Sequence, residues 1–368
     1  MNFVLHGTTL ALAWFLVVNL AASALVVWIS TRRLRTTSPA FWFAVRILPA
    51  CAATLFVTAV FLPSYWRYEP RDTMEGFDLT LTACAMAAGG LLAGAGIRGL
   101  LAWCRAASRV SLWLQAARPL RIGHSTIAAF EVDSERPLMA LAGVIRPRLI
   151  VTRGLMAALS EDELASCVTH ELGHWHAWDN LKRLAMRASP DVLFGTSTAQ
   201  EIERRWASAA EHAADDMAGY HGAAARCALA SALVKVAKLI PTPPVRAARG
   251  ESPASHRGRR CARMARRDER EYREYLNEEQ RSQPGCSAGR MQLEFHHGLL
   301  AEPISTLIGG GEIASRVRRL LDDRTLAPSD ARRVWIALAA AVIAIGAVYG
   351  PLLHAVHSAT ELLVQSLP

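Results

Sequence analysis

This sequence lacks the cysteine pairs of a zinc knuckle or a redox motif. Its seven cysteines are scattered over 368 residues, which argues against a disulfide framework and fits a reducing compartment for the soluble part. Lysine and arginine are absent before the first apolar run, which extends to about Ser30. A cleaved signal peptide has basic residues there and a shorter apolar core, so we expect this run to remain as a membrane helix.

Apolar residues, in contrast, are abundant. They make up 52% of the chain, and the mean hydropathy is +0.17. The net charge is +9. Such a basic balance fits a nucleic-acid partner, a surface of anionic lipid, or positive residues that flank membrane spans. The distribution of the charges has to decide among the three.

Four apolar stretches have the length of about 20 residues that crosses a bilayer. They cover about residues 9–30, 47–66, 79–97 and 334–354. The fold class predicted from them is an α-rich integral membrane protein with four transmembrane helices.

Arginines mark one side of this predicted bundle. They follow the first stretch in "TRRLR", end the third at Arg98, and precede the fourth at 332 and 333. Since basic residues favour the cytoplasmic side, both termini are predicted to lie outside a multi-pass protein of the cell (inner) membrane. Three spans then occupy 1–104 and a cytoplasmic domain 105–333. The fourth span and a short external tail take 334–368.

The predicted cytoplasmic domain contains "VTHELGHWHAWDN", residues 168–180. A capping box of Ser160 and Glu163 predicts a helix from about Glu161 to Trp178. On a helix, residues four apart share a face, so His170 and His174 can converge on one metal ion. Upstream, β-branched runs between residues 125 and 152 predict two or three strands.

A second helix supplies the candidate third ligand. Thr198 and Glu201 are expected to cap it, and its alanine-rich sequence extends to about Tyr220. A catalytic zinc ion takes three protein ligands and keeps a position for water. Glu211 is therefore predicted to join the two histidines, with Asp215 one helical turn further on.

The remaining polar residues of the motif have candidate roles around this zinc ion. Glu171 would take a proton from the attacking water and return it to the leaving amine. Asp215 could accept a hydrogen bond from the other ring nitrogen of a ligand histidine. Asp179 and Asn180 are expected to end the motif helix, and Asp179 is a second candidate for that supporting role.

At this point four segments resemble the membrane zinc peptidases of the BlaR/MecR antirepressor type. They are "GVIRPRLIV" at 143–151, "LSEDELASCVTHELGHWHAWDNL" at 159–181, "AAEHAADDMA" at 209–218 and "IASRVRRLLD" at 313–322. The resemblance implies a gluzincin-type α+β domain, helices beside a small sheet, with zinc ligands His170, His174 and Glu211 and catalytic base Glu171. It also implies a strand edge near 138–144 that binds substrate by strand addition.

One feature departs from that family, whose β-lactam receptors carry an external penicillin-binding sensor after the last span. Only a short tail follows here, so a separate sensor partner, or another signal, is expected. The Arg- and Pro-rich stretch at about 241–289 also looks like an addition, and we interpret it as an insert or linker.

The leading hypothesis is a signalling endopeptidase in the bilayer that cuts a cytoplasmic protein, either a transcriptional repressor or itself. The first alternative is a quality-control protease of the HtpX-like or CAAX type, ranked lower because HtpX-like proteins place membrane spans between the two motifs. The second is a non-enzymatic adaptor that binds through Arg257–Arg267. Nucleic acid is disfavoured as a partner because no aromatic residues interleave with these arginines. A homodimer stays open.

Overall fold

The computed structural model describes residues 2–32, 38–70, 79–122, 127–144, 146–239, 304–306, 313–322, 349–362 and 364. The predicted insert at 241–289 lies outside these residues. So does most of the predicted fourth span, of which the structure describes only 349–354, the first part of a helix over 349–362. We call this helix the C-terminal helix.

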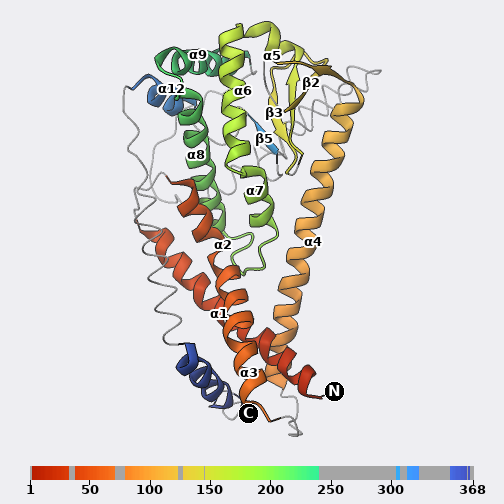
Figure 1. Cartoon of the computed structure of the whole chain (residues 1–368), viewed down its shortest axis with the longest axis vertical. Coiled ribbons are helices and arrows are strands. Elements are labelled where there is room, and N and C mark those ends of the chain that lie inside the picture. The colour runs from red at the N-terminus through yellow and green to blue at the C-terminus, as the bar shows by residue number, and fades with distance from the viewer. Residues whose placement is uncertain are drawn as a thin grey trace, which may run out of the picture.

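Three helical rods in the described chain are long and apolar enough to cross a membrane. The first is α1 (Asn2–Thr31), and the second joins α2 (Pro39–Phe56), the π-helical turn η1 (Val57–Phe61) and α3 (Leu62–Tyr68). The third, α4 (Leu79–Gln115), runs well beyond the predicted end at 97. Its 37 residues span about 55 Å, more than the roughly 30 Å of a bilayer core. Figure 1 shows α4 continuing upward to the sheet.

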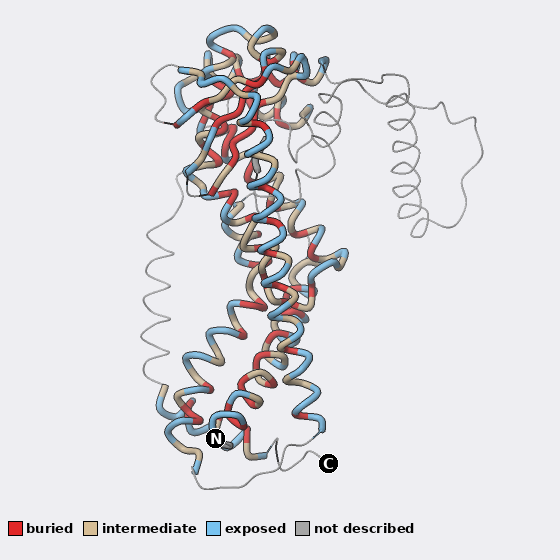
Figure 2. The backbone as a smooth tube through the Cα atoms, turned by 90° about the vertical axis from the view of Figure 1, so that its right-hand side faces the viewer, coloured by how far each residue is buried: buried red, intermediate tan, exposed pale blue. Residues whose placement is uncertain are grey.

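The two ends of the molecule differ in how far their residues are buried. In the lower part the helices are exposed along much of their length, whereas buried residues concentrate in the upper part (Figure 2). The exposed positions on the lower helices include large apolar side chains such as Leu20, Trp28 and Leu100. Apolar side chains on the outside of a bundle are what contact with lipid tails requires.

The upper part contains a five-stranded sheet in the order β1-β2-β4-β3-β5. Its strands are β1 (Ala117–Leu120), β2 (Ala128–Val132), β3 (Met139–Ala142), β4 (Arg148–Thr152) and β5 (Ile304–Thr306). β2 and β4 pair in parallel and the other pairs are antiparallel. The sequence predicted only the strands between 125 and 152.

The pairing of β5 corrects one expectation. Leu141 of β3 pairs with Ser305 of β5, and the neighbouring residues on each side are also paired. The edge near 138–144 is therefore already filled by this chain. β5 is the outermost strand on that side among the described residues, and it contacts both α6 and α7.

A group of helices packs beside the sheet and carries the sequence motifs. They are α5 (Arg153–Ala158), α6 (Glu161–His176), α7 (Asp179–Arg187), α8 (Ser197–Gly219), α9 (Ala223–Leu239) and α12 (Ile313–Leu321). Of these, α5, α6 and α7 are in contact with strands of the sheet. The predicted capping box of Ser160 and Glu163 is confirmed at the start of α6. At α8 the cap is Thr196, whose hydroxyl accepts from Ala199 N, so the predicted cap at Thr198 is wrong.

The end of the motif helix also differs from the expectation. Trp178 has a left-handed backbone conformation, with φ of 58°, and separates α6 from α7. Asp179 and Asn180 consequently begin the next helix and do not end the first. This tight turn directs α7 down toward the membrane helices (Figure 1).

The upper part is packed onto the membrane helices. A core of α1, α2, α7 and α8 residues includes Val26, Trp42, Ile202 and Trp206. Arg46, fully buried in α2, donates to Asp191 at 2.7 Å and to Glu203 of α8 at 2.9 Å. These contacts fix α8, the helix that carries Glu211, against the second membrane rod.

Candidate metal centre

Two helices that approach closely form the centre. His170 and His174 lie one turn apart on α6, and both are buried. Gly173 lies between them, and a Cβ added there would lie 3.1 Å from Ala214 Cα of α8. The absence of a side chain at Gly173 therefore lets α8 come near enough for Glu211 to face both imidazoles.

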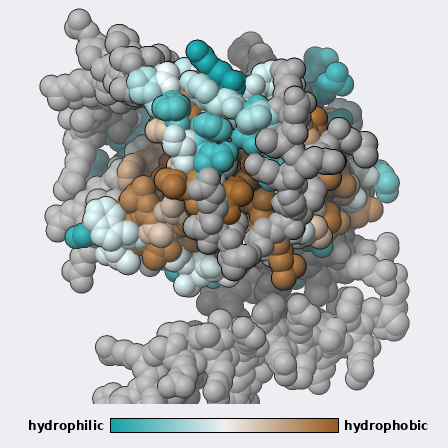
Figure 3. Space-filling model, turned by 90° about the horizontal axis from the view of Figure 1, so that it is seen from below, coloured by the Kyte–Doolittle hydropathy of each residue, from teal (hydrophilic) through white to brown (hydrophobic). Residues whose placement is uncertain are grey.

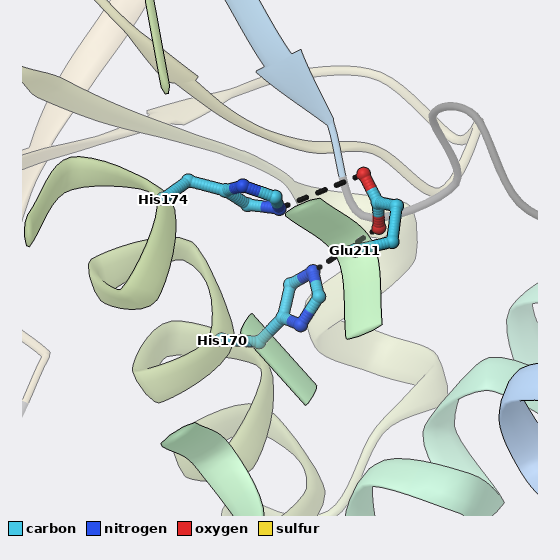
Figure 4. Close-up of side chains that lie close together, drawn as sticks. All are labelled: His170, His174 and Glu211. Carbon is cyan, nitrogen blue, oxygen red and sulfur yellow. Dashed lines mark ion pairs between the residues drawn. The ribbon is translucent and has the colours of Figure 1, made fainter. Parts of the chain in front are cut away.

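Glu211 bridges the two histidines (Figure 4). Its Oε2 lies 3.5 Å from His170 Nε2, and its Oε1 lies 3.6 Å from His174 Nε2. These separations are long for hydrogen bonds. Zinc holds nitrogen and oxygen ligands at about 2.0–2.2 Å, so two donors on one ion lie roughly 3.4–4 Å apart. The three residues thus have the spacing of a ligand set, and their donor atoms all lie within 4.8 Å of one another.

Unsatisfied polar atoms support the same interpretation. His174 Nε2 and Glu211 Oε1 are buried and have no hydrogen-bond partner among the described residues. Leaving such groups unpaired in the interior costs about 1–3 kcal/mol each, and more when they are charged. A divalent metal ion between them would satisfy both atoms, so the residues fit such an ion.

The other ring nitrogen of each histidine contacts a carboxylate. His170 Nδ1 lies 3.0 Å from Asp215 Oδ1, and His174 Nδ1 lies 2.8 Å from Asp179 Oδ2. A proton on each Nδ1 leaves each Nε2 with its lone pair directed toward Glu211. Carboxylate partners of this kind fix the ring orientation and make an imidazole a stronger ligand.

Asp179 and Asn180 also connect the centre to the sheet. Asn180 Nδ2 donates to the carbonyl oxygens of Leu141 and Gly143, both at 3.0 Å. Lys182 Nζ lies 3.3 Å from the second carboxylate oxygen of Asp179. Burial would raise the pKa of Asp179, but the hydrogen bond with His174 and the nearby positive charges outweigh it and lower the pKa.

Arg316 of α12 is the member of the site that the sequence did not predict. Its buried guanidinium contacts Asp215 with Nε at 2.9 Å and Nη2 at 2.6 Å, and Glu211 Oε2 with Nη1 at 2.9 Å. Burial alone would raise the pKa of Asp215 and Glu211, yet their histidine and arginine partners outweigh it and lower both values. These partners favour the ionised form of both carboxylates, which is the form that a metal ligand and an acceptor from His170 require.

The same cluster sets the protonation of His170. Burial would lower its pKa, but hydrogen bonds to Asp215 and Glu211 outweigh this and raise the pKa to about 9. A metal ion must displace that proton from Nε2, so metal binding at this centre is coupled to proton release.

Glu171, the predicted base, is fully buried on α6 between the two histidines. The pKa of Arg316 shows how close the charge of Glu171 lies. Burial would lower the pKa of this guanidinium, but the hydrogen bond to Asp215 and the nearby negative charges, including that of Glu171, outweigh burial and raise the pKa. Of the predicted residues, His170 and His174 both face Glu211, Asp215 contacts His170, and Asp179 contacts His174. Glu171 lies on the same helix as the two histidines.

Comparison with known families agrees with this geometry. The family model of peptidase family M48 matches residues 105–284, which include both motif helices. No curated protein sequence matches the chain. The family match and the His170, His174 and Glu211 cluster support a metallopeptidase, and the three apolar rods support a membrane-associated one. The narrower resemblance to antirepressor-type peptidases is not confirmed by this match.

Proposed function

We propose that this protein is an integral-membrane zinc endopeptidase that hydrolyses a protein substrate at the cytoplasmic face of the membrane. The observation that carries the proposal is the convergence of His170 Nε2, His174 Nε2 and the Glu211 carboxylate in one buried cluster. Two imidazoles and one carboxylate are the ligand set of catalytic zinc in peptidases of the thermolysin kind.

The protein residues divide the chemistry among them. A bound zinc ion would supply Lewis-acid polarisation of the scissile carbonyl and make water a better nucleophile near neutral pH. Glu171 accepts the proton of the attacking water and delivers it to the amine nitrogen as the C–N bond breaks. Asp215 and Asp179 keep the two imidazoles oriented throughout, because each holds an Nδ1 in place.

The sheet supports a protein substrate over a small molecule. An extended peptide can add to the edge of a sheet by main-chain hydrogen bonds. Because β5 pairs with β3, the edge strand on this side of the described sheet is β5, which lies against α6 and α7. In the close-up of the centre, β5 descends toward the space beside Glu211 and His174 (Figure 4). A peptide paired along β5 would therefore pass the metal ligands.

Two substrate classes follow from this activity. The antirepressor resemblance favours a cytoplasmic repressor, or the protein itself, cut in response to a signal from a separate sensor protein. A quality-control role is favoured by the connection between α7 and α8, which reaches into the membrane bundle. There Asn19, in the middle of α1, donates to Pro190 O at 2.8 Å, and Arg98 donates to Ser189 O at 3.1 Å. These bonds tie the connection between two helices of the centre to the first and third apolar rods, which suits substrates that emerge from the bilayer.

Metal content tests the ligand assignment first. The protein purified in detergent should hold about one zinc ion at this centre, lost in Glu211→Ala. Asp216→Ala is a matched control on the same helix, because Asp216 pairs with Arg319 away from the histidines. Zinc that is unaffected by Glu211→Ala would refute the ligand set.

Cleavage tests the catalytic assignment separately. Glu171→Gln should retain zinc and lose about 10²–10⁴-fold in peptide hydrolysis, the usual contribution of a general acid–base group. Undiminished hydrolysis by this variant would refute the role of Glu171. Comparing cleavage of a folded repressor with cleavage of an unfolded membrane protein separates the two substrate classes.

A further inference from the structure

A second group of metal-binding side chains lies at the opposite end of the membrane rods. Glu69 ends the rod formed by α2, η1 and α3, and His357 and Glu361 lie on the C-terminal helix. Figure 1 shows the C-terminal helix at the foot of the bundle, far below α6 and α8. Seen from below, this end presents hydrophilic side chains gathered to one side of an apolar surface (Figure 3).

The spacing of this group resembles that of the peptidase centre. His357 Nδ1 lies 3.8 Å from Glu69 Oε2. The corresponding distances between the two histidines and Glu211 in the peptidase centre are 3.5 and 3.6 Å. The separation between His357 and Glu69 exceeds a hydrogen bond and falls in the range of roughly 3.4–4 Å for two donors on one zinc ion. Glu361 brings a third donor, and all three donor atoms lie within 4.8 Å of one another.

The local structure holds these donors in position. His357 and Glu361 are four residues apart, so they share one face of their helix. The ring of Tyr68 stacks on the imidazole of His357 at 5.6 Å, with 26° between the planes, which restrains the imidazole beside Glu69. The side chain of Glu69 is only 5% exposed and that of His357 only 20%. This is a partly enclosed group, unlike a cluster of carboxylates in open solvent.

Neutral contacts on either side fix the C-terminal helix to the bundle without using the three donors. Ser64 Oγ donates to Leu353 O at 2.7 Å, and Trp14 Nε1 donates to Thr360 Oγ1 at 3.1 Å. Val356 packs with Phe61 and Tyr65 in the same core. The donors therefore come together on a scaffold that exists before any ion binds, which lowers the entropic cost of binding.

We propose that Glu69, His357 and Glu361 bind a divalent transition-metal ion, with Zn²⁺ as the probe, at the end of the membrane bundle opposite the peptidase centre. One imidazole and two carboxylates form a mixed nitrogen and oxygen set that zinc accepts. The same set is poor for Mg²⁺ and Ca²⁺, which take oxygen ligands and more of them. Bound metal would join the second membrane rod to the C-terminal helix. This proposal does not rest on the proposed peptidase activity.

Zinc counting in a two-by-two set of variants tests the second site. The untagged full chain is stripped with a chelator, reloaded with Zn²⁺ in excess Mg²⁺, desalted and measured by elemental mass spectrometry. We expect about two zinc ions in the wild type, about one in either Glu211→Ala or His357→Ala, and none in the double variant. His354→Ala removes an exposed imidazole that meets the same Tyr68 ring edge-on at 5.6 Å but is not one of the three donors, so this variant should keep both ions.

The outcomes separate the two sites. About one ion in the wild type and none in Glu211→Ala would overturn the second site and leave the peptidase centre standing. Two ions in Glu211→Ala but one in His357→Ala would overturn the ligand set of the peptidase centre and leave the second site standing. Glu361→Gln, which keeps the shape of the side chain, should weaken zinc binding at the second site by more than the 10–100-fold typical of lost outer partners. Unchanged counts and affinity in both second-site variants, or displacement by Mg²⁺, would overturn the proposal.

Discussion

Removing the charge of Arg316 should destabilise the upper part of the protein strongly. Its buried guanidinium is shared between Asp215 and Glu211, at 2.6 and 2.9 Å. Arg316→Met keeps much of the apolar stem but leaves two buried carboxylates without this partner. A zinc ion bound by Glu211 would not replace it at Asp215, because Asp215 contacts the far nitrogen of His170 and not the face of the ligand cluster.

The size of the effect follows from burial. Breaking a buried ion pair by removing one partner costs about 3–5 kcal/mol, because an uncompensated charge remains inside. For a folded unit of 150–250 residues, each kcal/mol lowers Tm by about 2–4 °C. The expected decrease is therefore about 6–20 °C. Arg316→Lys should recover only part of it, since an ammonium group keeps the charge but cannot make the forked contacts with both carboxylates.

Thermal unfolding of the zinc-loaded protein in detergent measures this decrease. Arg318→Met is the matched control, because Arg318 is exposed on the same helix, two residues further on. A variant that changes only a surface charge should shift stability by less than about 0.5 kcal/mol. If Arg316→Met had the same Tm as Arg318→Met and the wild type, the guanidinium would not be compensating the buried carboxylates. The electrostatic account of the centre would then be wrong.

Three further variants test other parts of the site. Gly173→Val should force α6 and α8 apart, lowering stability by about 1–3 kcal/mol and weakening zinc binding in calorimetric titration, whereas Ala165→Val on the exposed face of α6 should do neither. Asp179→Asn should weaken zinc binding about 10–100-fold in chelator competition, because its contact with a ligand imidazole is impaired. Burial would raise the pKa of Glu163, but hydrogen bonds from Lys235, Ser231 and Ser160 N outweigh it and lower the pKa from 4.5 to about 2. The stabilising effect of the ionised Glu163 is thus present above pH 4.5 and lost as pH falls toward 2. The difference in unfolding free energy between wild type and Glu163→Gln should be on the order of 2 kcal/mol at pH 7 and should vanish as the pH falls from 4.5 to 2.

The positions of the candidate metal ligands could be predicted because their geometry is local. Four-residue spacing on a helix determines that His170 and His174 share a face, and the same rule places Asp215 one turn after Glu211. The start of α6 was predictable for the same reason, since Ser160 and Glu163 satisfy each other's backbone donors. At α8 the predicted cap, Thr198, lies two residues after the observed cap, Thr196, an error within the usual uncertainty of helix ends.

Arg316 and β5 could not be predicted in the same way because their partners are distant in the chain. Arg316 is 101 residues from Asp215, and no spacing rule connects them. A partial signal exists, since Arg316 lies four residues before the buried Leu320 and so faces the core of an otherwise basic helix. β5 has three residues and pairs with a strand more than 160 residues earlier, too short a run to carry an alternating pattern.

The apolar rods are part of the structure that holds the candidate metal centre. Glu211 lies on α8, and the first half of α8 packs on α2 through Ile202 and Trp206. Arg46 of α2 is fully buried and contacts both Glu203 and Asp191. Deleting α2 would therefore leave these two acidic side chains without the guanidinium, beside an apolar face that has become exposed. Uncompensated charge and exposed apolar area both act against folding. A fragment that begins at residue 105 would retain every predicted ligand, yet it would lack the surface on which the third ligand's helix rests.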